Sequence, residues 1–98
     1  MIYLLFYDIS NNKIRTKIAK LLISEGFERI QFSVYTSLKN PEKNETLWTT
    51  LLNLTETEND AKIYVIALTK NNFKNIKIIG NFDFDIDYLT GEKRSLTF

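Results

Sequence analysis

The chain has 98 residues, a formal net charge of +1 and an apolar fraction of 44%, all ordinary for one small globular domain. It contains no cysteine and no histidine, which excludes disulfides, thiolate zinc sites, cysteine nucleophiles and the commonest general base. A functional metal would therefore be held by oxygen, which favours Mg²⁺, Mn²⁺ or Ca²⁺.

The first predicted strand ends in a carboxylate. Residues 1–8, MIYLLFYD, form a dense apolar run that predicts a strand buried on both faces. Asp8 ends this run where the chain turns towards a helix, and the end of a rigid strand is a common place for a functional side chain. The same carboxylate would suit the start of a turn or a helix cap equally well.

A helix is predicted after this strand. Apolar residues recur at helical spacing from Ile14 to Leu22, with Ser10 or Asn11 as the N-cap. Gly26 stands where a helix C-terminus favours a residue with positive φ.

The face of this helix opposite the apolar stripe is basic. It carries Lys13, Lys17 and Lys20, and no acidic residue occurs between positions 10 and 24. Such a stripe is usually a solvated helix face, and the missing counter-charges strengthen the alternative that it contacts phosphates. Arg15 lies near the border of the apolar stripe, close in sequence to Asp8.

Residues 27–36, FERIQFSVYT, are rich in aromatic and β-branched residues and predict β-structure. They could form one long strand, or two short strands separated by a tight bend near Phe32 and Ser33. Periodicity leaves both open.

The second half of the chain predicts a helix and two more strands. The second helix begins with Pro41 in its first turn, and Trp48 on its apolar stripe is expected in the core. Residues 61–68, AKIYVIAL, predict a central strand, residues 71–72 a turn and residues 76–79 a short strand. Two helices on one face of a small mixed sheet, as in an α+β ferredoxin-like βαββαβ sandwich, is the simplest packing.

The tail, residues 81–98, departs from this pattern. In NFDFDIDYL, aromatic and aliphatic residues alternate with aspartates, which predicts an amphipathic strand on the edge of the same sheet or of a second copy. A calcium loop is excluded because Tyr88 and Arg94 occupy the positions of its glycine and glutamate. We therefore expect a domain over 1–80 and a dimerisation tail over 81–98. With no membrane span and no signal peptide in the sequence, we expect a cytoplasmic protein.

The ordered motifs of the first third resemble a known family. YDIS at 7–10, KIRTKIAKLL at 13–22, Gly26 and ERIQFSVY at 28–35 are similar to the second CRISPR-associated protein family, the small partner in spacer acquisition that is often named an endoribonuclease. The resemblance implies a ferredoxin-like homodimer whose extra C-terminal strand pairs with the partner subunit. It also implies binding to the larger CRISPR-associated integrase and metal-dependent cleavage of single-stranded RNA or double-stranded DNA.

The resemblance further implies Mg²⁺ (or Mn²⁺) at Asp8, bound by both subunits near the two-fold axis. One aspartate is a poor magnesium site, and a dimer would supply the second carboxylate. The metal would activate a water that attacks phosphorus, with cations stabilising the added charge and with Ser10 and Gln31 helping to position the groups. The candidate catalytic residues are Asp8, Tyr7, Arg15, Arg29 and Ser33. The candidate nucleic-acid-binding residues are Lys13, Arg15, Lys17, Lys20, Arg29 and Gln31.

Other functions are compatible with these residues. Arg29 and Gln31 would equally form cross-strand surface pairs. The protein could be a non-catalytic scaffold that bridges integrase dimers and binds the incoming DNA. A generic RNA-binding ferredoxin-like module, which lacks here the glycines of its signature, and a toxin-like ribonuclease of the same fold are weaker alternatives.

Overall fold

A computed structural model describes residues 1–80. The expected C-terminal strand, within 81–98, lies outside the described residues. Four strands form one sheet in the order β2-β3-β1-β4: β1 (Ile2–Asp8), β2 (Glu28–Gln31), β3 (Val34–Ser37) and β4 (Lys62–Leu68). Every strand pair within it is antiparallel, so the described sheet is not the mixed sheet that was expected.

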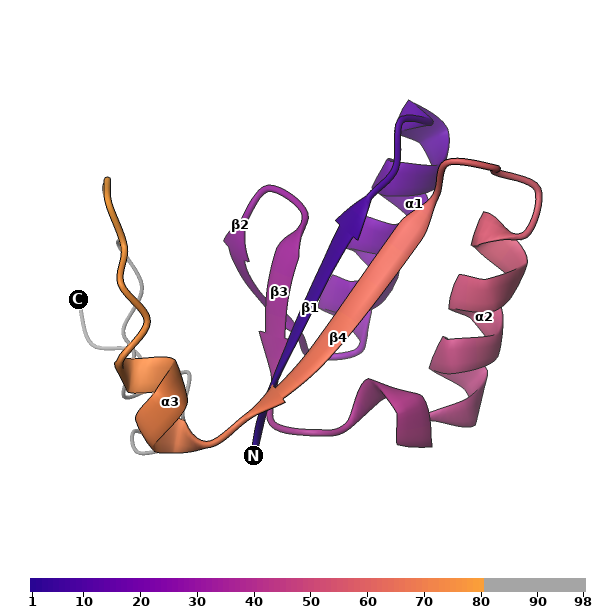
Figure 1. The fold of residues 1–98 in the computed structure, drawn as a ribbon. Helices are drawn as coiled ribbons and strands as arrows, with labels where there is room; N and C mark the ends of the chain where they lie inside the picture. The colour runs from indigo at the N-terminus through magenta and orange to yellow at the C-terminus, as the bar shows by residue number, and fades with distance from the viewer. Residues whose placement is uncertain (81–98) are drawn as a thin grey trace.

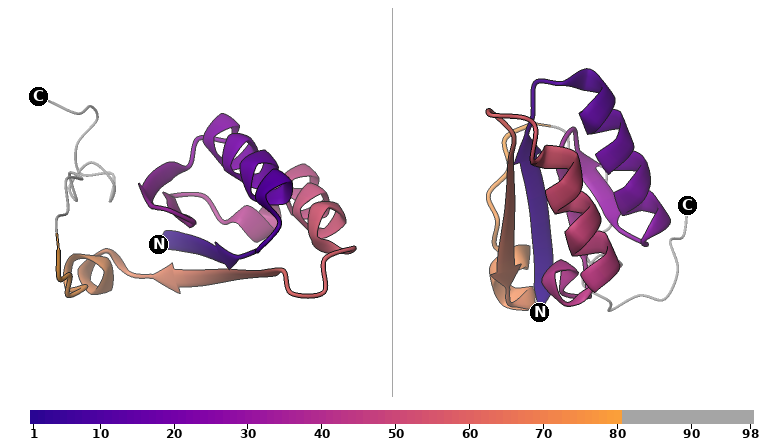
Figure 2. Two further views of the ribbon diagram at one scale, coloured as in Figure 1. Left: turned by 90° about the horizontal axis from the view of Figure 1, so that it is seen from above. Right: turned by 90° about the vertical axis from the view of Figure 1, so that its right-hand side faces the viewer.

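Helices α1 (Asn12–Ser24) and α2 (Glu45–Thr55) cover one face of the sheet (Figures 1 and 2). The element order β1-α1-β2-β3-α2-β4 is the ferredoxin-like α+β arrangement predicted from the sequence. Among residues 1–80, the opposite face carries no long helix, and only the short helix α3 (Lys70–Lys74) reaches it. Among the described residues, no helix combines the length and the apolarity needed to cross a bilayer.

Capping residues define the ends of α1. The Asn11 side chain accepts hydrogen bonds from the backbone N–H groups of Lys13 (2.9 Å) and Ile14 (3.1 Å), so Asn11 is the N-cap. After the helix, Gly26 adopts φ +88°, a conformation that a residue with a Cβ rarely takes.

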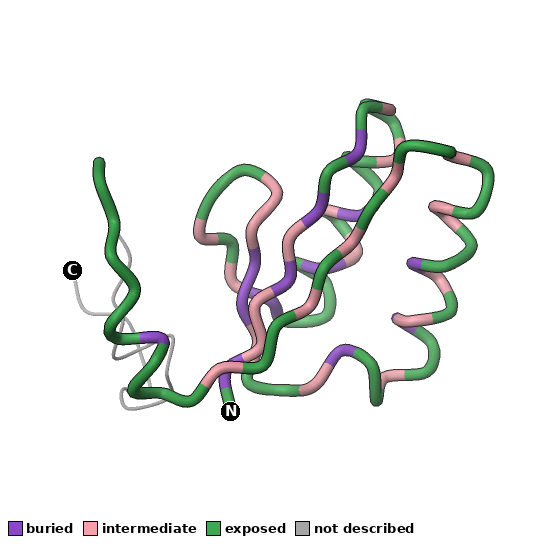
Figure 3. The backbone as a smooth tube through the Cα atoms, in the orientation of Figure 1, coloured by how far each residue is buried: buried purple, intermediate pink, exposed green. Residues whose placement is uncertain are grey.

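The core fills the space between the two long helices and the sheet. It consists of one cluster of buried side chains: Leu5, Tyr7, Ile9, Ile18, Leu22, Phe27, Tyr35, Leu47 and Leu51. A smaller cluster on the other face joins Ile2 to Phe73 of α3. Burial alternates with the two-residue period of a strand from Leu4 to Asp8 in β1 and from Lys62 to Ile66 in β4 (Figure 3).

Residues 27–36 contain two strands. Ser33 adopts φ +65° between β2 and β3, and the two strands form an antiparallel hairpin with a register shift between Arg29 and Gln31. A left-handed residue reverses the chain, so one continuous strand is excluded.

The second helix begins later than predicted. Pro41 starts a short 3₁₀ helix, η1 (Pro41–Lys43), and α2 begins at Glu45. The Asn44 side chain accepts a hydrogen bond from the N–H of Leu47 (3.1 Å). Asn44 is therefore the N-cap of α2, and it lies three residues after Pro41. Trp48 packs against the core, as expected.

Three expectations for the last third were wrong. Strand β4 lies at an edge of the described sheet, not at its centre. Among the described strands it pairs with β1 alone. Residues 71–72 lie in helix α3, which Thr69 caps and which buries Phe73 against Ile2. Residues 76–79 form no strand, and Ile79 is fully exposed.

Candidate functional site at the Asp8 end of the sheet

Asp8 is the last residue of β1 and is exposed. Ile2, Leu4, Phe6 and Asp8 share one face of the strand by its two-residue period. That face is the one opposite α1 and α2, hereafter the open face. The carboxylate therefore stands at the edge of an apolar surface, next to solvent.

Two hydrogen bonds tie the loop after β1 to the loop before β4. The Asn11 side chain donates to Glu58 Oε1 at 2.8 Å, and the Ser10 hydroxyl donates to Asp60 Oδ2. Glu58 and Asp60, which precede β4, thus lie at the same end of the molecule as Asp8. Each is already held by a neutral donor.

No group of three or more acidic side chains among the described residues could hold a metal ion by itself. Asp8 alone supplies one carboxylate, whereas Mg²⁺ uses one or two carboxylates together with waters and substrate phosphates. Asp8 could therefore be one oxygen ligand of Mg²⁺ or Mn²⁺, and waters, substrate phosphates or a second carboxylate would complete the site.

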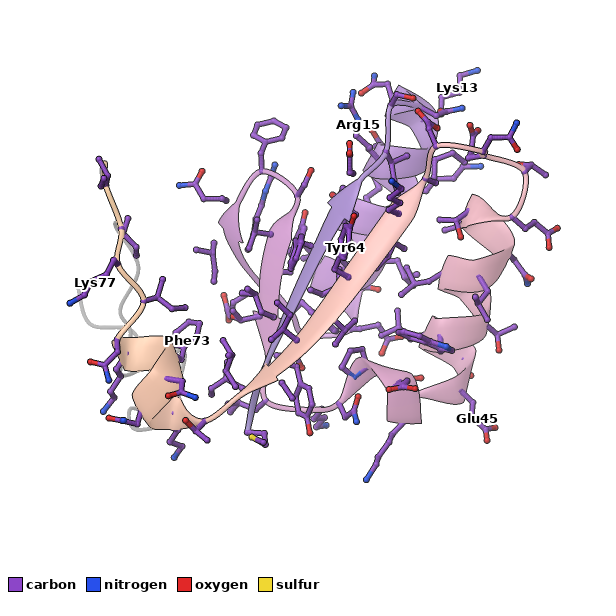
Figure 4. All side chains as sticks on the ribbon, viewed as in Figure 1. Lys13, Arg15, Glu45, Tyr64, Phe73 and Lys77 are labelled. Carbon is purple, nitrogen blue, oxygen red and sulfur yellow. The ribbon has the colours of Figure 1, made fainter. Side chains whose placement is uncertain are left out.

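The N-terminal half of α1 brings cations to this end. Lys13 and Arg15 lie at the upper end of the molecule, where β1 ends (Figure 4). The Arg15 guanidinium donates to Asn12 Oδ1 at 3.0 Å, which holds it near the first turn. Lys17 and Lys20 are exposed further along α1, so Lys20 lies about 10 Å along the axis from Lys13.

Tyr7 lies on the other face of β1. Its ring is buried in the core and stacks on Tyr35, with ring centroids 6.1 Å apart. Its backbone N–H donates to the carbonyl of Ser33 at 3.1 Å. Tyr7 and Ser33 therefore join the end of β1 to the tip of the β2–β3 hairpin through the backbone, and the Tyr7 ring does not lie beside Asp8.

Arg29 and Gln31 are exposed on β2, the outer strand of the sheet. Strand β3 lies between β2 and β1, which sets β2 about 10 Å from β1 in the plane of the sheet. The Arg29 guanidinium lies over the ring of Phe32, with Cζ 4.5 Å from the ring centroid. Within one chain, then, the structure gathers Asp8, Ser10, Lys13 and Arg15 and keeps Arg29 and Gln31 apart from them.

The open face next to Asp8 is apolar. Phe6 and Tyr64 stack with centroids 4.7 Å apart and an interplanar angle of 13°. Tyr64 and Ile66 are each 43% exposed, and Figure 4 shows Tyr64 on β4. This surface could not be predicted from the sequence, because residues 61–68 resemble a strand that is covered on both faces.

Comparisons with known proteins agree with this fold. The family model described as CRISPR associated protein Cas2 matches residues 1–76. The CRISPR-associated endoribonuclease Cas2 1 of Archaeoglobus fulgidus is 31% identical over 81 residues, which cover 83% of this chain and 85% of that protein.

Three solved structures are similar. The crystal structure of Streptococcus pyogenes Cas2 at pH 6.5 gives a TM-score of 0.67 at 22% identity, covering 82% of this chain and 100% of that one. A hypothetical protein, TT1823 from Thermus thermophilus, gives 0.66 at 23% identity, with 85% and 94% covered. A chain of a partial Cas6-RT-Cas1–Cas2 complex gives 0.59 at 29% identity, with 80% and 89% covered. At 22% and 23% identity, the likenesses to the Streptococcus pyogenes and Thermus thermophilus structures show the fold alone.

Proposed function

Because the chain belongs to the Cas2 family of CRISPR-associated proteins, we propose that it is a metal-dependent endonuclease of the spacer-acquisition step that acts as a homodimer. The observation that carries this proposal is the position of Asp8. It is an exposed carboxylate on a rigid strand end, at the border of an uncovered apolar face and at the same end as Lys13 and Arg15.

The dimer follows from two deficits of the single chain. Among the described residues, Asp8 alone would leave most of the ligands of a magnesium ion to water and substrate, and Tyr64 and Ile66 on the open face are each 43% exposed. Packing the open faces of two copies against each other would cover both apolar surfaces. The same packing would bring two Asp8 carboxylates towards one axis, since Asp8 lies on that face.

The chain's own residues would then have distinct tasks. Two Asp8 carboxylates would hold Mg²⁺ or Mn²⁺, which supplies Lewis-acid activation of water for phosphodiester hydrolysis. Lys13 and Arg15 would bind the phosphates on either side of the bond to be cut. Ser10, held by Asp60, would fix the loop that follows Asp8. The substrate would be single-stranded RNA or double-stranded DNA.

A non-catalytic scaffold is the second candidate. It is supported by the likeness to a chain of a Cas1–Cas2 complex and by the lack of a complete metal site within the described residues of one chain. In this role a dimer would bridge two dimers of the integrase Cas1 and bind the incoming DNA through α1.

The variant Asp8→Asn tests both functions. It keeps the shape of the side chain and removes the negative charge, so we expect cleavage of RNA or duplex DNA in Mg²⁺ to fall at least about a hundredfold, as for loss of a group central to catalysis. Glu42→Gln removes an exposed carboxylate in η1, which follows the end of β3 that pairs with the start of β1, far along the strand from Asp8, and should cleave normally. Sedimentation should find both variants dimeric, because loss of two facing charges does not weaken the contact.

Spacer integration by Asp8→Asn, with Cas1 present, separates the candidates. Normal integration without cleavage would establish the scaffold. Loss of both activities supports the nuclease as the working function, and undiminished cleavage would exclude Asp8 as the metal ligand.

A further inference from the structure

Phe32 has the most exposed aromatic ring that the structure describes. It lies between β2 and β3, and 84% of its surface is open to water. An apolar ring in water forgoes the stabilisation of burial, and the fold does not need this side chain for its core. A single exposed aliphatic residue would be unremarkable, but a flat ring at the tip of a hairpin can serve as a contact surface.

The tip that carries the ring is held in place. Ser33 adopts φ +65° and so fixes the turn, while its carbonyl accepts the hydrogen bond from the Tyr7 N–H. This bond places the tip beside the end of β1, next to the residue that precedes Asp8 in the chain. The distance between the tip and the Asp8 carboxylate is therefore set by backbone, not by a flexible loop.

One face of the ring is occupied by a cation. The Arg29 Cζ lies 4.5 Å from the ring centroid, within the range of a cation–π contact. With the ring still 84% exposed, its second face is open to a ligand. The pair thus offers a flat apolar surface on one side and guanidinium N–H donors on the other.

We propose that Phe32 and Arg29 form a stacking site for an unpaired nucleobase of a strand bound at the Asp8 end. Every base has a π-face, and the guanidinium of Arg29 would contact the adjacent phosphate. A protein surface could also cover Phe32, but the cation against the ring and the basic start of α1 at the same end favour a polyanion.

The site distinguishes between substrates. Bases inside a duplex are stacked on both faces and cannot reach a protein ring without being unpaired. The Phe32 site therefore favours single strands, or the frayed end of a duplex, over continuous duplex. This inference rests on the proposed function, because it assumes that nucleic acid binds at the Asp8 end.

The test compares Phe32→Ala with Phe32→Tyr, which keeps the ring, and with Leu38→Ala, which removes another exposed apolar side chain. Affinities are measured for a single-stranded oligonucleotide and for a covalently closed duplex without ends. We expect Phe32→Ala to weaken single-strand binding by about 5- to 100-fold and to leave closed-duplex binding unchanged. Phe32→Tyr and Leu38→Ala should bind both ligands as the unmodified chain does.

Two further measurements identify the contact. A 2-aminopurine in the strand should be quenched on binding by the unmodified chain and less so by Phe32→Ala. The salt dependence of single-strand affinity should keep its slope in Phe32→Ala but become shallower by about one in Arg29→Gln, which loses a phosphate contact.

The outcomes separate this site from the proposed nuclease. If the Phe32→Ala protein binds single strands normally while Asp8-dependent cleavage is intact, the stacking site is wrong and the nuclease stands. Equal losses for the two ligands, or a loss of self-association alone, would also overturn it. An unmodified chain that binds neither ligand overturns the proposed function and this site together.

Discussion

Tyr35 is fully buried, and its hydroxyl makes no well-formed hydrogen bond within the described part of the chain, although the Tyr7 hydroxyl lies nearby. A buried polar group without a partner costs about 1–3 kcal/mol of desolvation. We therefore expect Tyr35→Phe to be at least as stable as the original chain at neutral pH, by thermal unfolding. Tyr7→Phe, in the ring that stacks on Tyr35, is the matched control and should change stability little. A clear loss of stability in Tyr35→Phe would mean that the hydroxyl has a partner after all, such as one from a second chain.

The same residue gives a pH dependence. Burial, with a smaller contribution from the nearby Tyr7 hydroxyl, raises the pKa of Tyr35 to about 12. The unfolded chain loses this proton near pH 10, so between pH 10 and pH 12 the folded state binds more protons and the free energy of unfolding falls as pH rises. Tyr35→Phe should lack this part of the alkaline destabilisation, which a series of thermal melts from pH 8 to pH 12 would measure.

Single residues differ in how well the sequence predicts them. Asp8 could be identified because a charge at the end of an apolar run stands out and the strand is a strong prediction. Phe32 could not, because alternation placed it with Ile30 and Val34 on an apolar face. The positive φ of Ser33 breaks that alternation, and a bend here was only one of two alternatives because residues 27–36 contain no glycine, asparagine or aspartate to signal it.

At the scale of elements, Asn11 has two roles. Its oxygen caps α1, and its amide group donates to Glu58 in the loop before β4. We expect Asn11→Ala to cost about 1 kcal/mol, or roughly 4–8 °C in melting temperature for a domain of this size. Asn12→Ala, one residue away, removes only a contact with Arg15 and should cost much less.

Asn11→Asp separates the two roles. Aspartate keeps the capping oxygen but replaces the donor that faces Glu58 with a second negative charge. An intermediate loss of stability that salt partly restores would identify the loop-to-loop bond. If Asn11→Asp is as stable as the original chain, that bond contributes nothing measurable.

The elements also mark the limit of sequence reasoning. Helix α1 was predictable from its caps and its apolar spacing, since both are local signals. The position of β4 was not predictable. A continuous apolar run looks the same in a central strand and in an edge strand that a second copy or a helix covers. The helix at 70–74 was missed because Asn71 and Asn72 suggest a turn, whereas packing of Phe73 against Ile2 favours the helix.

For the whole molecule, the open face is the surface on which the proposed dimer would depend. We expect Ile66→Glu to raise the dimer dissociation constant about a hundredfold or more, because it would bury an unpaired carboxylate. Leu52→Glu, at a position on α2 that is 56% exposed, is the matched control and should leave the dimer intact. Sedimentation velocity over a range of concentrations measures both. A dimer that tolerates Ile66→Glu would place the contact elsewhere.

The position of β1 in the sheet also sets the order in which the chain can fold. Ile2 pairs with Leu68, so the first strand to leave the ribosome keeps one edge unpaired until the last strand of the described sheet is made. At about 5–20 residues per second, synthesis needs roughly 3–13 s to reach that point. During this time the apolar run that carries Asp8 is available to other nascent chains. Slower production at lower temperature, or early access to chaperones, should therefore raise the soluble yield more than any change at the surface of the finished domain.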